Sequence, residues 1–217
     1  MKDYSTNELI KEKAKELAFK YGLKSVSLDE IAKLSRISKK TIYKFFDDKN
    51  AIIQTMVDEL IQSHNQLFKA TQSTANDAID EVLKQDSCMS LICKNVRPSL
   101  LHELEKFFPI SWKQLKQYNQ NIYESNIGNL QRGKEEGLYR ADIDIRFISD
   151  LRMHQLINVL KPEILTSNNL SVTRLATELT VLYLHAVTTE KGKKLLDKYL
   201  NEKKRTDTSL QDNDVQC

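Results

Sequence analysis

A short run of lysine and hydroxyl-bearing residues stands at the start of an apolar-periodic segment near residue 40. Its outward-facing members and their N-terminal neighbour are Ser38, Lys39, Lys40, Thr41, Tyr43 and Lys44. Lysine ammonium groups neutralise phosphates, a threonine can hydrogen-bond a base edge or touch a thymine methyl group, and a tyrosine hydroxyl can reach a phosphate oxygen. The combination is typical of contacts to double-stranded DNA. On charge alone, a solvated helix face explains the lysines equally well.

The elements that would position these residues are two short helices separated by three residues. Ser27 and Glu30 form a capping box for the first helix, and Ser38 is the expected N-cap of the second. Ala32 is small enough for a close helix crossing, and Ile37 can fill the angle between the helices. This spacing predicts a helix-turn-helix, whose second helix enters the major groove. A helical hairpin with a basic rim is the alternative.

The distribution of charge and the small number of helix-breaking residues limit the fold classes open to the chain. The whole chain has a net charge of only +3, but residues 1–50 hold twelve Lys/Arg against eight Asp/Glu. Five Gly and three Pro in 217 residues favour an all-α fold of about nine or ten helices. We expect a helix-turn-helix domain at 1–47, a helical domain at 48–203 whose first helix is 48–70, and a disordered tail at 204–217.

The segment 10–52 resembles the DNA-binding domain of TetR-family transcriptional regulators. The resemblance rests on "AKELAFKYG", "SLDEIAKLSRIS" and "KKTIYKFFDDKNAI", in this order and at the family's spacing. It implies that Ser27 and Lys49 hold phosphates at two helix N-termini. Arg36 and Lys40 stand where many members have glycine, and both add positive charge beside the DNA. A non-glycine residue in a left-handed turn costs on the order of 1 kcal/mol.

The same resemblance implies that the C-terminal helices dimerise and enclose a small-molecule pocket. The segment "GKEEGLYRADIDI" looks like the turn before the dimerisation helices, here 145–161 and 171–189. Their apolar stripes, which could also face the chain's own core, include Ile148, Leu151, Gln155, Leu175, Leu179, Leu182, Tyr183 and Ala186. An aromatic cluster and its neighbours could line the pocket or form a packed core: Cys88, Met89, Ile92, Phe107, Phe108, Trp112, Tyr118, Ile122 and Tyr123.

Catalysis, cofactors and metals find no support in the sequence. It contains no phosphate-binding glycine loop, no His-Glu-x-x-His motif and no Gly-x-Ser-x-Gly turn. Three cysteines argue against a disulfide framework, and no apolar run is long enough for a membrane span, so a cytoplasmic location is expected. The resulting hypothesis is a repressor that binds a palindromic operator as a homodimer and is released by a small apolar ligand. The alternative is a helical protein-interaction module without sequence-specific DNA binding.

Overall fold

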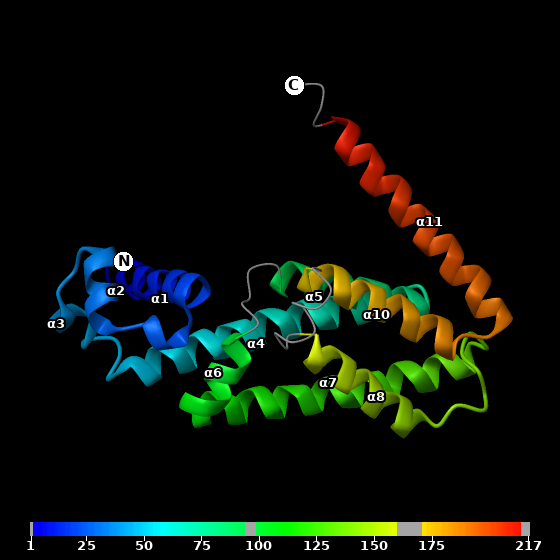
Figure 1. Ribbon diagram of the computed structural model, residues 1–217, viewed down its shortest axis with the longest axis horizontal. Coiled ribbons are helices and arrows are strands. Elements are labelled where there is room, and N and C mark those ends of the chain that lie inside the picture. The colour runs from blue at the N-terminus through cyan, green and yellow to red at the C-terminus, as the bar shows by residue number, and fades with distance from the viewer. Residues whose placement is uncertain (1, 94–98, 160–170, 214–217) are drawn as a thin grey trace.

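The chain folds into α-helices joined by short connections, as expected (Figure 1). A computed structural model describes residues 2–93, 99–159 and 171–213. Its helices are α1 (Lys2–Tyr21), η1 (Leu23–Ser25), α2 (Leu28–Ser35), α3 (Lys39–Ile42), α4 (Lys49–Thr74), α5 (Ala78–Cys93), α6 (Ser99–Phe107), α7 (Pro109–Glu135), α8 (Ile145–Asn158), α10 (Val172–Val187) and α11 (Glu190–Asn213). Within these ranges no helix combines the length and apolar character that a membrane span requires.

The N-terminal unit packs α1, α2 and α3 around one apolar core. Ile10, Ala14 and Leu17 recur at helical spacing on α1 and are buried there with Ile31 of α2 and Ile42 of α3. Ser5 and Glu8 have the spacing of a capping box, which predicts that the first helix begins after Ser5, but α1 already begins at Lys2. No glycine or proline precedes Ser5 to stop the helix from extending.

Helix α4 connects this unit to the remainder of the molecule and belongs to both. Asp48 caps it, since the Asp48 carboxylate accepts a hydrogen bond of 2.8 Å from the Ala51 N–H. The sequence predicted a loop at "KATQSTAND", but α4 continues to Thr74. Hydroxyls in this stretch donate to carbonyls of the preceding turn, as Thr74 does to Ala70 at 2.8 Å, so the polar residues remain compatible with a helix.

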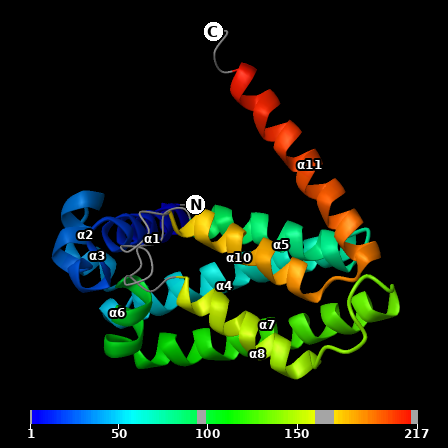
Figure 2. The same ribbon diagram turned by 45° about the vertical axis from the view of Figure 1, so that its right-hand side comes forward.

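The C-terminal bundle is built from α4, α5, α7, α8 and α10 (Figure 2). Helix α5 packs between α4 and α10, and α7 packs against α4 and α8. A second core forms at the end far from α3, where Tyr139 lies buried against α7 and the start of α5. Helix α11 leaves the bundle at this end and extends away from it, through Asn213 and thus into the segment for which a disordered tail was predicted.

Candidate DNA-binding surface and adjoining cavities

Two serine caps set the geometry of the helix-turn-helix. The Ser27 Oγ accepts from the Glu30 N–H at 3.1 Å, and the Ser38 Oγ accepts from the Thr41 N–H at 3.0 Å. Between the two helices, Arg36 adopts a left-handed conformation with φ 54° and ψ 38°. Of the described residues it is the one non-glycine with positive φ, so the turn carries the strain expected of a residue with a Cβ in this conformation.

The second helix of the motif is short. Helix α3 covers Lys39–Ile42 and continues as turns, and Ile42 is fully buried. Lys39, Lys40, Tyr43 and Lys44 are exposed, and Lys39 forms an ion pair with Asp29 at 2.8 Å. The unit therefore presents three lysines and a tyrosine to solvent from a capped helix and the turn after it.

Lys49 does not point toward this surface. Its Nζ donates a hydrogen bond of 3.0 Å to the Lys24 carbonyl and lies 5.5 Å from the centre of the Phe108 ring. Burial lowers the pKa of the Lys49 ammonium. The phosphate contact that the family resemblance implies for Lys49 is therefore not prepared in this structure, because its ammonium ties α4 to η1.

Helix α6 is a part of the site that the sequence did not reveal. The Glu103 carboxylate accepts from the Lys24 N–H at 3.1 Å, and a Cβ on Gly22 would lie only 2.7 Å from a Glu103 oxygen. Gly22 therefore provides both the positive φ of 93° that ends α1 and the space for this contact. Leu100 and Leu104 of α6 are buried in the N-terminal core, so α6 completes that core from outside the motif.

The residues predicted to line one ligand pocket are spread over several environments. Phe107 is exposed beneath the Lys24 ammonium, while Phe108 and Trp112 pack against the N-terminal core. Tyr118, Ile122 and Tyr123 belong to a small cluster between α4, α7 and α8, and the side chain of Ile92 lies outside the described residues. Sequence proximity misled here because successive turns of α6 and α7 face different neighbours.

Three cavities adjoin the described helices. The first, of about 340 Å³ and lined mostly by apolar residues, lies between α1, α4 and α6. A second, of about 420 Å³ and bounded by α4, α5 and α11, includes Cys88. A third, of about 30 Å³ between α5, α7, α8 and α10, includes Met89 and Ile122. None of the three collects the predicted aromatic residues, and no group of residues within the described ranges is arranged to hold a metal ion.

The predicted dimer residues divide into exposed and buried sets. Leu182 is 60% exposed, Leu151 is 47% exposed, and Ala186 is also exposed. Tyr183 is buried in the chain's own core, with its ring 4.9 Å from the Arg152 guanidinium. The prediction is wrong for Tyr183, because α10 turns that side of the helix toward α5 and α8. The partly buried members are Ile148, Gln155, Leu175 and Leu179.

Comparison with known proteins agrees with this architecture. Residues 10–56 match the family model "Bacterial regulatory proteins, tetR family". The uncharacterized HTH-type transcriptional regulator YdeS of Bacillus subtilis is 21% identical over 154 residues, which cover 69% of this chain and 75% of YdeS. The HTH-type transcriptional regulator TtgR of Pseudomonas putida is 31% identical over 75 residues, 35% of each chain. A gamma-butyrolactone receptor described as ArpA-like superposes with a TM-score of 0.70 at 15% identity, covering 88% of this chain and 92% of its own.

An all-α fold that carries a capped helix-turn-helix with an exposed basic second helix defines a DNA-binding transcriptional regulator. The family model identifies the DNA-binding domain. Through this domain, residues 10–56, the chain belongs to the TetR family of transcriptional regulators.

Proposed function

We propose that this regulator is a cytoplasmic repressor that binds a palindromic operator as a homodimer and releases it when a small, mostly apolar molecule binds. The observation that carries the proposal is the solvent-exposed set of Lys40, Tyr43 and Lys44 on α3 and the turn that follows it, a segment fixed by the Ser38 cap and the buried Ile42. An ordered segment presents these groups at fixed spacing, so they can follow the phosphates and base edges of one groove.

A homodimer follows from the size of the recognition surface. One short helix reads only a few base pairs, and two copies related by a two-fold axis read two half-sites about 34 Å apart. The exposed Leu151 and Leu182 on α8 and α10 supply apolar surface for such an interface. A small-molecule effector is supported by the apolar cavity at α1, α4 and α6, and one structural neighbour is named as a receptor for a gamma-butyrolactone.

The first prediction tests the DNA-binding surface. Selection from random duplexes should yield a palindrome, and Lys40→Ala and Lys44→Ala should each weaken binding to it and to random DNA alike. Each lysine that neutralises one phosphate should lower the slope of log K against log salt by about one. Lys194→Ala on α11, exposed and distant from the motif, is the matched control.

The outcome separates the repressor from the alternative of a protein-interaction module. A DNA regulator must prefer one duplex over random DNA by a large factor, whereas a basic interaction surface binds all duplexes alike. Failure to enrich any sequence, or identical salt slopes for the three variants, would reject the proposed surface.

A further inference from the structure

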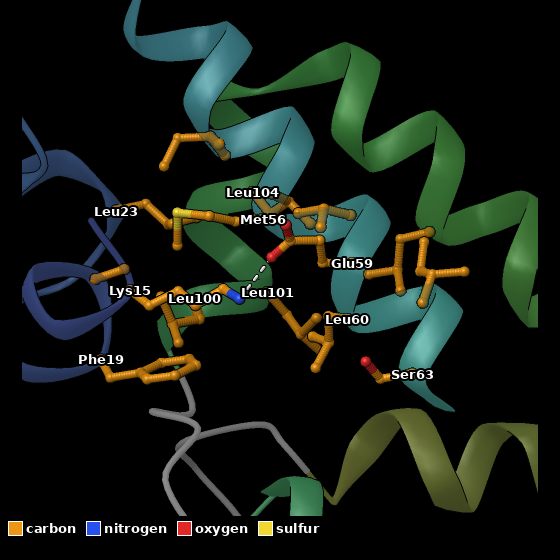
Figure 3. Close-up of a pocket in the computed structure, with 15 residues that line it drawn as sticks. Lys15, Phe19, Leu23, Met56, Glu59, Leu60, Ser63, Leu100, Leu101 and Leu104 are labelled. Carbon is orange, nitrogen blue, oxygen red and sulfur yellow. Dashed lines mark hydrogen bonds and ion pairs between the residues drawn. The ribbon is translucent and has the colours of Figure 1, made fainter. Parts of the chain in front are cut away.

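The cavity between α1, α4 and α6 lies where the DNA-binding unit meets the helical bundle (Figure 3). Its volume of about 340 Å³ is within the range of small-molecule sites. Twelve of its fifteen lining residues are apolar, among them Leu23 of η1, Met56 and Leu60 of α4, and Leu101 of α6. Phe19 and Leu60 remain 36% and 41% exposed at the cavity, so apolar surface there is left uncovered.

The polar residues of the cavity are Lys15, Glu59 and Ser63, and the first two join α1 to α4. The Lys15 Nζ lies 2.6 Å from a Glu59 oxygen, which Figure 3 shows as a contact across the cavity. Glu59 has a second cationic partner in Lys11, and Lys11 also pairs with Glu8 at 2.6 Å. Glu59 therefore pairs with two lysines. Lys11 is buried and does not line the cavity, whereas Lys15 lines it.

The ion pairs of Glu59 with Lys15 and Lys11 favour an anionic ligand over a cationic one. The Lys15 side chain is 39% exposed, and if it turns toward an anion, Glu59 keeps its ion pair with Lys11. A cationic ligand would instead have to compete for Glu59 with two ammonium groups, and the Lys11 side chain is only 9% exposed. Removing one of the two carboxylates that pair with the buried Lys11 ammonium is costly, so the site favours an anion at Lys15.

We propose that this cavity binds an amphiphile with an apolar body and a single anionic head group, and that Lys15 exchanges Glu59 for that head group. The claim that occupancy alters DNA binding rests on the proposed function. Helix α1 packs against α2 within the DNA-binding unit, whereas α4 continues into the bundle and α6 is followed directly by the bundle helix α7. A ligand bound between α1 and these helices shifts the equilibrium toward the orientation of the DNA-binding unit, relative to the bundle, that it binds more tightly.

The probes are decanoate, decanol and decyltrimethylammonium, titrated calorimetrically into the full chain below their micelle concentrations. Decanoate should bind about three- to tenfold more tightly than decanol, the range expected for one partly exposed ion pair, and the cation should bind most weakly. Lys15→Met should remove the preference for decanoate over decanol. Lys13→Met, on the same helix but outside the cavity, should retain it.

A second pair of variants tests the location. Leu60→Trp should fill the cavity and lower decanoate affinity at least tenfold. Leu67→Trp is the matched control, because Leu67 is 39% exposed on the same helix and does not line this cavity. Equal decanoate affinity in both tryptophan variants, or equal affinity of the parent for decanoate and decanol, would overturn the assignment.

The coupling to DNA is measured separately with the selected operator duplex. Saturating decanoate should weaken operator binding of the parent and of Leu67→Trp by some 5- to 150-fold and leave Leu60→Trp unchanged. Calorimetric binding without any effect on the operator would overturn the effector role of the cavity. A chain that prefers no duplex would reject the proposed repressor and leave the calorimetric result standing.

Discussion

At the scale of single residues, His64 is the least expected member of the interior. It lies buried on α4, with its ring 5.3 Å from the Tyr118 ring and 5.4 Å from the Phe68 ring. Neither ring nitrogen has a hydrogen-bond partner within the described residues. Burial lowers the pKa of His64 to about 4, so the folded chain holds this imidazole neutral.

His64 therefore links stability to pH. The unfolded chain protonates this imidazole near its ordinary pKa of 6.5, whereas the folded chain does so only near 4. Between these values the unfolded state binds more protons, so the free energy of unfolding falls as the pH drops from 6.5 toward 4. The shift corresponds to a loss of about 3 kcal/mol.

His64→Phe should abolish this component, because phenylalanine packs against the same rings and does not titrate. Urea unfolding at pH 7 and pH 4.5 should show a difference in unfolding free energy that is about 2 to 3 kcal/mol smaller in the variant than in the parent. His102→Phe, at an exposed histidine on α6, should leave the difference as in the parent. If both variants lost stability in acid equally, His64 would not be the group responsible.

Sequence reasoning at this scale succeeded where the physics is local. The caps at Ser27 and Ser38 depend on residues three positions apart, and both were correctly predicted. It missed the contact of Lys49 with Lys24 and the burial of Tyr183, because their partners come from distant segments and the chain pattern does not contain them.

At the scale of elements, close packing of the Tyr139 ring on Gly133 fixes the end of α7. A Cβ on Gly133 would overlap the ring of Tyr139, which is buried against it. The Tyr139 hydroxyl donates to the Ala78 carbonyl at 3.0 Å, and the Gly133 carbonyl accepts from the Tyr139 N–H at 2.9 Å. The turn after α7 therefore holds α5 and α7 together through one ring.

Gly133→Ala should destabilise the fold by about 3 kcal/mol, since the ring must move from a packed site and its hydroxyl loses the Ala78 carbonyl. Gly128→Ala on the same helix is the control. No atom lies within 4 Å of a Cβ placed there, so alanine should stabilise by up to about 1 kcal/mol. Chemical denaturation measures both, and equal stability of the two variants would contradict the role assigned to Tyr139.

Helix positions were predictable along most of the chain because glycine, proline and apolar periodicity report them directly. Pro98 and Pro109 in the sequence predict a helix over 98–107, and α6 spans Ser99–Phe107. Its packing against η1 was not predictable, since the contact of Glu103 with Lys24 joins segments far apart in sequence. The same limit applies to the cavity, whose lining comes from five separate elements.

At the scale of the whole molecule, the proposed dimer should depend on exposed apolar residues of α8 and α10. Leu182→Glu should convert the dimer to a helical monomer, because a two-fold interface buries the introduced charge twice. Ile110→Glu is the control, since Ile110 is 62% exposed at the start of α7, against 60% for Leu182. Light scattering gives the mass of each, and a dimer that survives Leu182→Glu would place the interface elsewhere.

The burial of Leu100, Leu104 and Phe108 in the N-terminal core limits how the DNA-binding unit can be exchanged by recombination. The family model ends at residue 56, but the core of the unit that it describes includes residues more than forty positions later in the sequence. Recombination that transplants only the matched segment would bring an incomplete core to its new host. The matched segment therefore needs α6, or equivalent apolar residues of a new host, to complete its core.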